Sequence, residues 1–250
     1  MEYYLTIDRG NSKLKAALWD KTGHLVSQSS SAPERLASEV ALDLMTPVFD
    51  SETVLAGCAY SSVVATYTER DLSGLQTLCH RVLNVTSAVK LPFRNDYPTL
   101  GADRIAAICG ALEIAPKGRP LLVVDSGTAV TYEFIDSEGN YLGGNIAPGL
   151  RLRINSLFTQ TDALPEIPTG GPVPLIGYDT DTAIRSGVVL GMLGEILYYI
   201  KQWGPDVVTV LTGGGSSYME EQSLLTFEHI LDAHLVLRGL YTILRYNEIN

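Results

Sequence analysis

The sequence is poor in basic charge, and this scarcity limits its partners. Its 250 residues contain 18 Lys and Arg against 28 Asp and Glu, which gives a net charge of −10. A protein that mainly binds nucleic acid needs a basic surface for the phosphates, and anionic membrane surfaces also select basic residues. We therefore expect neither nucleic acid nor a membrane as a partner. Disorder is excluded as well, because 46% of the residues are hydrophobic and can form a core.

Cysteine and long apolar runs are also scarce. The three cysteines, Cys58, Cys79 and Cys109, show no Cys-x-x-Cys spacing, and their odd number argues against a disulfide framework. We expect buried free thiols, which suit a reducing cytoplasm. The N-terminus lacks the features of a signal peptide, and Glu195 interrupts the longest apolar stretch, residues 187–200. These features predict a cytoplasmic protein.

What the sequence does contain is a weak internal repeat. An apolar stretch at residues 3–7 ends at Asp8, and a second apolar stretch at residues 121–124 ends at Asp125. In both places a second predicted strand, a turn with glycine and a third predicted strand follow in the same order. The segment at residues 115–120 contains Pro and Gly and is the natural joint between the two copies.

The repeat predicts an α/β protein of two similar halves, residues 1–116 and 117–250. The expected helices span residues 68–83, 103–114, 149–158, 181–203 and 233–246. The longest of them has apolar residues at three- and four-residue steps, which is typical of a packed helix. A stretch rich in Pro, Gly and Thr, residues 159–177, predicts a surface loop.

The residues that follow the first strand are suited to binding phosphate. This motif consists of Asp8, Gly10, Asn11, Ser12, Lys13 and Lys15. Backbone amides and short polar side chains hold phosphate oxygens, lysine adds charge, and a carboxylate can hold hydrated Mg²⁺. The same pattern also occurs in ordinary hairpin turns. Phosphate binding is favoured because Asp125 and Thr128 form a matching turn half a chain later, as in the actin, hexokinase and acetate kinase superfamily, which this arrangement resembles.

A second candidate site lies at the start of the predicted helix 103–114. It consists of Gly101, Ala102, Asp103 and Arg104. The simpler interpretation is that Asp103 stabilises the N-terminus of the helix. The alternative is that Asp103 accepts a proton from a substrate hydroxyl while Arg104 binds an anionic group beside it, as phosphoryl transfer requires.

Taken in order along nearly the whole chain, these motifs resemble those of type III pantothenate kinases. The matching segments are residues 8–15, 101–104, 125–129, 143–149, 177–187, 212–214 and 237–240. The resemblance implies a ribonuclease H-like (actin-like ATPase) fold whose two halves face each other across a cleft. It also implies ATP-dependent phosphorylation of the primary hydroxyl of pantothenate, the first step of coenzyme A biosynthesis. Ser12 replaces the family's usual Thr and keeps its hydroxyl.

The resemblance implies a role for each matching residue. Asp103 is the expected catalytic base, Asp8 holds Mg²⁺ through water, and Asp125 holds a monovalent cation, K⁺ or NH₄⁺. The ATP phosphates are expected at Asp8, Gly10, Asn11, Ser12, Lys13, Lys15 and Thr128. Pantothenate is expected at Gly101, Ala102, Asp103, Arg104 and Thr180, and at Tyr97. The last of these would replace a family tyrosine, because Arg94 occupies the usual tyrosine position.

Three questions stay open at this stage. The family is homodimeric, which suggests that helix 181–203 contacts a second copy, but the same helix could be ordinary core. A sugar or acid kinase of the same superfamily is an alternative enzyme. A regulatory relative without catalysis is the other alternative, although the retention of Asp8, Lys15, Asp103 and Asp125 argues against it.

Overall fold

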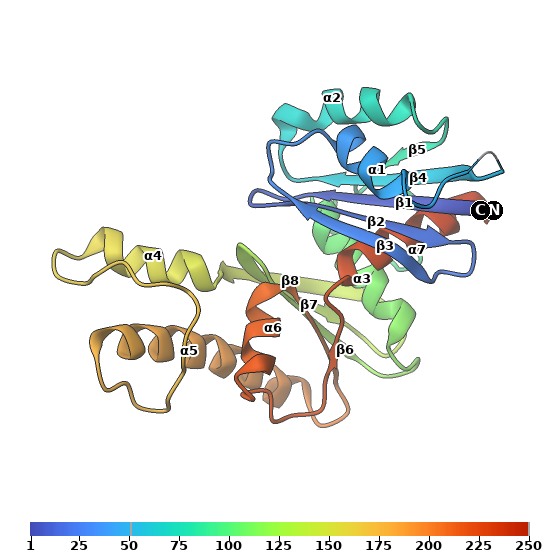
Figure 1. Cartoon of the computed structure of the whole chain (residues 1–250). Coiled ribbons are helices and arrows are strands. Elements are labelled where there is room, and N and C mark those ends of the chain that lie inside the picture. Colours follow the sequence, from blue (N-terminus) through green and yellow to red (C-terminus); the bar gives the residue numbers. More distant parts are fainter. Residues whose placement is uncertain (51, 250) are drawn as a thin grey trace. The chain divides into compact units, whose positions relative to one another are not determined.

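The computed structural model describes residues 1–50 and 52–249, and the chain divides into two compact units. The first unit comprises Met1–Ile114 and His234–Asn250, and the second comprises Ala115–Ala233. Each unit is built on its own five-stranded mixed sheet (Figure 1). The prediction of an α/β fold made of two similar halves is confirmed. The division differs from the predicted 1–116 and 117–250 in the last helix, which belongs to the first unit.

The sheet of the first unit has the strand order β3-β2-β1-β4-β5. Its strands are β1 (Glu2–Arg9), β2 (Leu14–Asp20), β3 (Leu25–Ser31), β4 (Val54–Ser62) and β5 (Val82–Asn84). Its helices are α1 (Ala37–Met45), α2 (Ala65–Gln76), α3 (Ala102–Ile114) and α7 (Leu235–Ile249). The central strand β1 pairs antiparallel with β2 and parallel with β4, so the strand ends of β1 and β4 lie at the same edge.

Side chains alternate along β1, so that the two faces of this sheet pack against different helices. Leu5 and Ile7 enter a core with residues of α1 and the end of α2. Tyr4 points to the opposite face, where its ring meets that of Tyr241 of α7 edge-on at 5.7 Å. Asp8 shares this second face with Tyr4, because the two positions differ by an even number of residues. The phosphate motif therefore begins on the side of the sheet that α3 and α7 cover.

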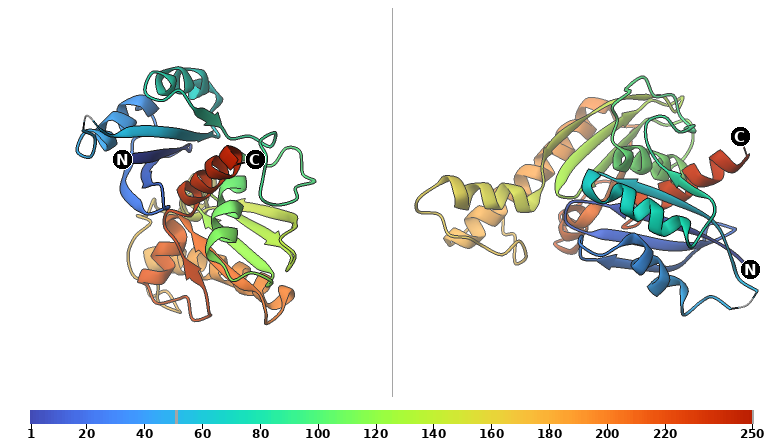
Figure 2. Two further views of the ribbon diagram at one scale, coloured as in Figure 1. Left: turned by 90° about the vertical axis from the view of Figure 1, so that its right-hand side faces the viewer. Right: turned by 90° about the horizontal axis from the view of Figure 1, so that it is seen from above.

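Two glycines allow α3 and α7 to pack closely, which is why the last helix joins the first unit. A Cβ atom on Gly110 of α3 would lie 2.3 Å from the carbonyl oxygen of Leu235. A Cβ atom on Gly239 of α7 would lie 1.7 Å from the carbonyl oxygen of Ala106. Both distances are far inside van der Waals contact, so only glycine fits. The two helices run side by side in both views of Figure 2.

The sheet of the second unit repeats this order with its own strands, as β8-β7-β6-β9-β10. The strands are β6 (Leu121–Ser126), β7 (Ala129–Ile135), β8 (Tyr141–Pro148), β9 (Val208–Thr212) and β10 (Ile230–Leu231). Its helices are α4 (Leu150–Gln160), α5 (Thr180–Trp203) and α6 (Gly213–Glu221). Reading β6 as the counterpart of β1 matches every strand of one sheet with a strand of the other.

The hairpin turns after β2 and β7 show how closely the two copies agree. Gly23 and Gly139 both have a φ of +85°, a left-handed conformation that favours glycine. The amide of Gly23 donates to the carbonyl of Asp20 at 3.1 Å, and the amide of Gly139 donates to the carbonyl of Asp136 at the same distance. The internal repeat predicted from the sequence is therefore present in the backbone.

The sequence patterns misplace several helix boundaries. The helix predicted at residues 68–83 is wrong in its last part, because α2 ends at Gln76 and residues 82–84 form β5. Val82 and Leu83 are apolar at helical spacing from α2, but they pair with Cys58 and Ala59 as an edge strand. The helices α1 and α6 are absent from the predictions. The start of α6 contains three successive glycines, which in sequence favour a turn.

An ion pair joins the two long helices of the second unit. The Arg153 guanidinium of α4 donates to both carboxylate oxygens of Glu195 of α5 at 2.7 Å, and the Tyr132 hydroxyl donates to the same carboxylate at 2.6 Å.

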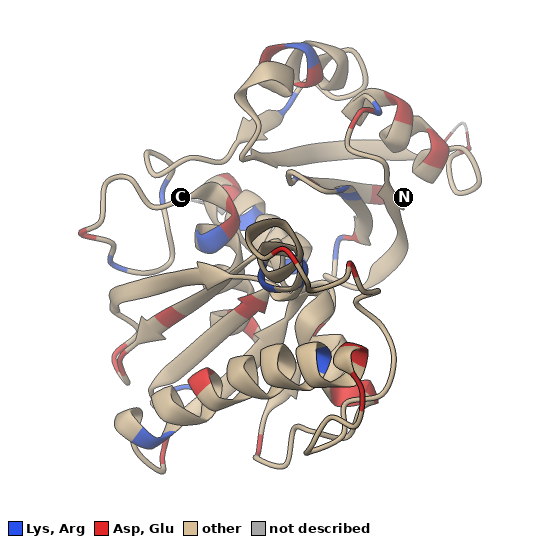
Figure 3. Cartoon of the chain, turned by 90° about the vertical axis from the view of Figure 1, so that its left-hand side faces the viewer, with Lys and Arg blue, Asp and Glu red and all other residues tan. Residues whose placement is uncertain are grey.

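Helix α5 is long and apolar enough to cross a membrane by length and composition alone. Packed helices of soluble proteins pass the same test. Charged residues are sparse along α5, and an uncharged stretch separates two of them from the other two (Figure 3).

Candidate functional site

A row of three polar side chains crosses the first sheet at the end of its central strand. Asp8 of β1 is opposite Lys15 in the antiparallel pairing with β2 and opposite Ser61 in the parallel pairing with β4. Side chains of directly opposed residues point to the same face of a sheet. The Ser61 hydroxyl donates a hydrogen bond of 2.6 Å to Oδ1 of Asp8. The row Lys15–Asp8–Ser61 therefore brings a cation, a carboxylate and a hydroxyl donor together.

The surroundings of Asp8 act on its charge in opposite directions. Burial raises the pKa of the Asp8 carboxyl above its ordinary value, since a buried charge loses hydration. The Ser61 hydrogen bond and the charge of Lys15 lower it, and the charge of Asp103 raises it. The pKa of Asp8 therefore responds to charges from both the phosphate motif and the substrate motif, which belong to the same unit.

The turn after β1 presents most of the predicted phosphate-binding residues to solvent. The Gly10 amide donates to the Lys13 carbonyl at 3.0 Å, which closes the turn. The side chains of Asn11, Ser12 and Lys13 are exposed. Lys15 is half-buried on β2 and belongs to the row described above. Exposed amide, hydroxyl and ammonium groups beside a half-buried carboxylate are the donors and the metal-binding oxygen that a polyphosphate requires.

Helix α3 begins directly at the predicted substrate motif, and Asp103 lies in its first turn. The Asp103 carboxylate oxygen Oδ1 accepts from the Arg104 amide at 2.9 Å. A Cβ atom on Gly101 would lie 2.7 Å from the same oxygen, so a side chain at position 101 would displace the carboxylate. Gly101 thus leaves the space that Asp103 occupies, and the acid sits at the positive end of the helix dipole.

Arg104 and Tyr97 are neighbours in the structure. Arg104 is nearly buried, with 7% of its surface exposed, whereas Tyr97 is 40% exposed. The Arg104 guanidinium carbon lies 5.7 Å from the centre of the Tyr97 ring, within cation–π range. The proposed substitute tyrosine therefore lies beside the arginine of the substrate motif, although its role as a ligand is a prediction.

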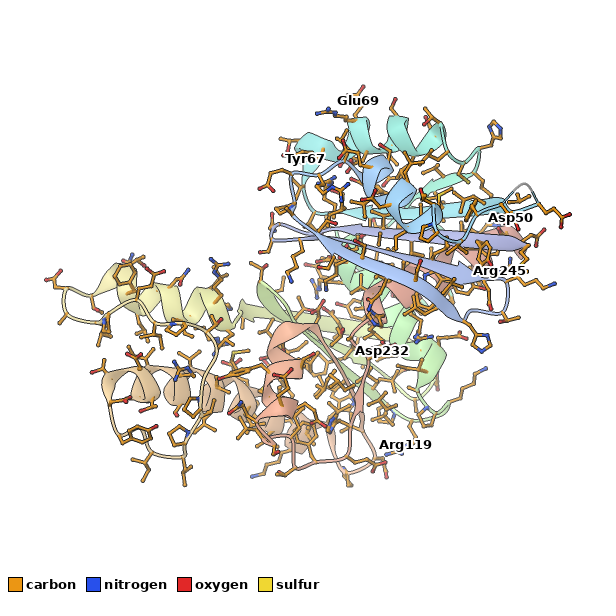
Figure 4. All side chains as sticks on the ribbon, viewed as in Figure 1. Asp50, Tyr67, Glu69, Arg119, Asp232 and Arg245 are labelled. Atoms are coloured by element: carbon orange, nitrogen blue, oxygen red, sulfur yellow. The ribbon has the colours of Figure 1, made fainter. Side chains whose placement is uncertain are left out.

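A buried ion pair next to the phosphate motif has no signal in the sequence. The Arg9 guanidinium donates to both carboxylate oxygens of Asp71 of α2, and it also donates to the Arg35 carbonyl at 2.8 Å. The Tyr60 hydroxyl donates to Asp71 at 2.8 Å. The Arg9 side chain also lies 4.5 Å from the centre of the Tyr67 ring, which Figure 4 labels on α2. These contacts tie the residue that follows Asp8 to the opposite face of the sheet.

The second unit presents its own aspartate at the corresponding place. Asp125 of β6 is opposite Thr131 of β7 and Thr212 of β9, and it is half-buried. A Cβ atom on Gly213, the first residue of α6, would lie 2.5 Å from Oδ1 of Asp125 and 2.7 Å from the Ser126 carbonyl oxygen. Two oxygens therefore lie against a backbone position that only glycine fits.

The remaining predicted residues of the second unit lie near two helix starts. Thr128 is exposed in the turn after β6, and its carbonyl accepts from the amide of Gly149 at 3.0 Å, just before α4. Thr180 is the exposed first residue of α5. The preceding Asp179 caps this helix by accepting from the Thr182 amide at 2.8 Å. Both threonines are thus accessible on well-defined turns.

The residues present fit a metal that is shared with phosphate. Within residues 1–50 and 52–249, no group of three or more His, Cys, Asp or Glu side chains could enclose a metal ion. Mg²⁺ usually keeps several waters and binds one or two carboxylates together with substrate phosphates. Asp8 beside an open polar turn suits this mode, and Asp125 with the Ser126 carbonyl offers oxygen ligands to a second cation.

The fold defines the class of protein first. The chain matches the inorganic polyphosphate/ATP-glucomannokinase of Arthrobacter sp. strain KM with a TM-score of 0.53 at 14% identity, covering 99% of this chain and 100% of that one. A structure from Campylobacter jejuni described as a Baf family transcriptional activator matches with a TM-score of 0.63 at 23% identity, covering 98% and 100%. These similarities and the repeated unit define an actin-like ATPase fold of the sugar kinase kind.

The sequence places the chain within that class. The sequence profile of the type III pantothenate kinases matches residues 4–202. A type III pantothenate kinase from Phocaeicola vulgatus is 38% identical over 251 residues, covering 98% of each chain. The chain therefore belongs to the type III pantothenate kinase family, as its ordered motifs predict.

Proposed function

We propose that this protein transfers the γ-phosphoryl group of ATP to the primary hydroxyl of pantothenate, giving 4′-phosphopantothenate and ADP in the first step of coenzyme A biosynthesis. Family membership supports the choice of reaction and substrate. The observation that carries the proposal is that the first unit presents two separate acids, Asp8 in the row with Lys15 and Ser61, and Asp103 in the first turn of α3. One carboxylate can hold a metal for the phosphates and the other can accept a proton, which are two separate needs of phosphoryl transfer.

In this proposal the substrate motif handles the acceptor. Asp103 orients the pantothenate hydroxyl and accepts its proton as the oxygen bonds to the γ-phosphorus and the bond to ADP breaks. Gly101 and Ala102 keep the approach to this carboxylate open. Arg104 binds the pantothenate carboxylate or amide region, with Tyr97 against its guanidinium and Thr180 as a further polar contact.

The phosphate motifs handle ATP. Mg²⁺, when bound, offsets charge on the phosphates, and Asp8 would hold it through water. The groups that donate to phosphate oxygens are the turn amide of Gly10 and the side chains of Asn11, Ser12, Lys13, Lys15 and Thr128. Positioned donors of this kind supply most of the catalysis in phosphoryl transfer, because the protein forms no covalent bond to the phosphorus.

Asp125 is proposed to hold K⁺ or NH₄⁺. Its carboxylate and the Ser126 carbonyl provide hard oxygen ligands against Gly213. Activity should then be several-fold higher in K⁺ or NH₄⁺ than in Na⁺ at equal ionic strength. Equal activity in all three salts would remove the reason for this assignment.

We also propose a cytoplasmic homodimer. The described cysteines are free and buried, which suits a reducing compartment. The segment before α5 exposes Leu175, Ile176 and Tyr178 by 74% to 84% of their surfaces, and α5 exposes Tyr198 by 59%. Large exposed apolar side chains that are close in sequence are typical of protein interfaces. A sedimentation experiment at micromolar concentration that finds only a 27.1 kDa species would contradict the dimer.

The experiment that tests the function compares Asp103→Asn with the native protein. We expect the native protein to release ADP when pantothenate is added with ATP, Mg²⁺ and K⁺, and not with glucose or acetate. Asp103→Asn should lower kcat by about 10²- to 10⁴-fold, the usual contribution of a general base. Asp43→Asn is a matched control, because it makes the same chemical change in an exposed ion pair with Arg35. Near-native turnover by Asp103→Asn would exclude the base assignment.

A further inference from the structure

Ser61 is a buried hydroxyl whose position depends on strand pairing rather than on a loop. It is fully buried near the end of β4, in direct register with Asp8 of the neighbouring parallel strand. Its hydroxyl donates to Oδ1 of Asp8 at 2.6 Å, a short bond of the kind that charged acceptors form. Because β4 continues its pairing with β1 on both sides of this point, the donor is fixed relative to the carboxylate.

The bond constrains what the Asp8 carboxylate can do. A carboxylate has two oxygens, each able to accept more than one hydrogen bond. When Ser61 occupies one side of Oδ1, rotation of the carboxylate is restricted and Oδ2 takes a defined direction. Residues that hydrogen-bond a metal-binding carboxylate in this way orient it, and their mutation typically costs about 10- to 100-fold in metal affinity or activity.

The internal repeat provides a second, independent observation. In the second sheet the residue in register with Asp125 on the parallel neighbour is Thr212, which is 2% exposed. Both sheets therefore place a buried hydroxyl residue beside the aspartate that is next to last in the central strand. On the other side of the aspartate the two sheets differ, with Lys15 in one and Thr131 in the other. The residue beside the aspartate on the parallel strand, β4 or β9, carries a hydroxyl in both sheets. The residue on the antiparallel strand, β2 or β7, is a lysine in one sheet and a threonine in the other.

We propose that Ser61 is a positioning residue that orients the Asp8 carboxylate toward the hydrated divalent ion of the nucleotide. This inference rests on the proposed function, in which Asp8 holds that ion through water. Ser61 itself contacts neither ion nor substrate, so its removal should change metal affinity and kcat and leave the KM for pantothenate unchanged.

The test measures Mn²⁺ binding by electron paramagnetic resonance in the presence of ADP, together with steady-state kinetics. Ser61→Ala should weaken Mn²⁺ binding by about 10-fold, within the range known for residues that support a metal ligand. Ser61→Cys gives a second variant of similar size with only a weak donor, and it should behave in the same way. Asp8→Asn provides the reference for loss of the ligand itself.

Thr6→Val is the matched control for folding. Thr6 is also a fully buried hydroxyl in the same sheet, where it accepts from the Trp19 indole at 2.8 Å and donates to the Ala17 carbonyl at 3.4 Å. We expect this variant to lose thermal stability while it keeps native Mn²⁺ affinity. Ser61 variants that lose only stability, as Thr6→Val does, would overturn the inference. If Asp8→Asn itself bound Mn²⁺ like the native protein, the metal role of Asp8 in the proposed function would fail instead.

Discussion

The two sheets carry an aspartate at the same place and surround it differently. In the first sheet Asp8 lies between Lys15 and Ser61, and in the second Asp125 lies between Thr131 and Thr212. Strand order, the pairing directions of the central strand and the hairpin turn agree between the two. The two rows therefore differ in charge at one position, where the first sheet has a lysine and the second has a threonine.

This difference separates what a repeated scaffold determines from what its side chains add. The backbone brings an acid to the end of the central strand in both units, next to a glycine-bearing turn. A lysine beside that acid adds a fixed positive charge, which in the proposed function serves the phosphate oxygens. Two threonines supply no charge, and in the proposed function a bound cation supplies it at Asp125. In the proposed function, one scaffold therefore supports two different ways of binding a polyphosphate.

For the comparison of the two rows, the largest effect is expected from removing the charge that distinguishes them. Lys15→Met should lower kcat/KM for ATP by about 10²-fold, because it removes a positioned donor to the phosphates. Thr131→Val makes the corresponding change in the second row, where only a hydroxyl is lost, and should cost less than about 3-fold. Steady-state kinetics with varied ATP and saturating pantothenate measure both.

The outcome distinguishes the two rows only if the variants fold equally well. Thermal unfolding provides that control, since Lys15 and Thr131 are both half-buried and neither change should prevent folding. Equal losses in the two variants would contradict the view that the lysine gives the first row its special role.

Local signals explain how much of this architecture the sequence predicts. Four strands, β1, β2, β6 and β7, are apolar and bounded by Asp and Gly. Their order and the repeat can therefore be predicted from the sequence alone. Helix α6 is not visible, because Gly213, Gly214 and Gly215 favour a turn. It forms through packing: a Cβ atom on Gly215 would lie 2.9 Å from the Ser126 Cβ, and the Ser216 hydroxyl donates to the Ser126 hydroxyl at 3.0 Å.

The candidate site shows the same limit. Asp8 and Asp103 are found in sequence because each lies in a recognisable short motif. Ser61 and Asp71 are not, because their partners depend on which strands become neighbours and in which register. A parallel pairing such as β1 with β4 joins residues more than 50 positions apart, and nothing local in the sequence specifies it.

A smaller effect tests the equivalence of the two hairpin turns. Gly23→Ala and Gly139→Ala both place a side chain at a φ of +85°, which costs about 1–2 kcal/mol. A Cβ atom at position 23 would also lie 3.2 Å from the Tyr241 ring of α7. Gly139→Ala should lower the midpoint of thermal unfolding by a few degrees, and Gly23→Ala should lower it further. Equal shifts would show that the Tyr241 ring of α7 moves aside with no loss of stability.

The smallest expected effect concerns the carboxylates of the same turns. Asp20 accepts from the Thr22 hydroxyl at 2.6 Å and from the His24 amide at 3.0 Å, and these bonds, led by that of Thr22, lower the pKa of Asp20 to about 2. Asp136 has a lowered pKa for the same kind of reason, chiefly through Asn140. A lowered pKa means that each ionised carboxylate stabilises the fold above its ordinary pKa near 3.8, and that this contribution is lost as the pH falls toward the folded value.

Asp20→Ala and Asp136→Ala should therefore lower the unfolding midpoint at pH 7 by about 1–2 °C, since both groups face solvent. Measured again at pH 3, the differences from the native protein should shrink in both variants. A difference that stays constant with pH in only one turn would show that the two copies share their backbone geometry but not the electrostatic basis of their stability.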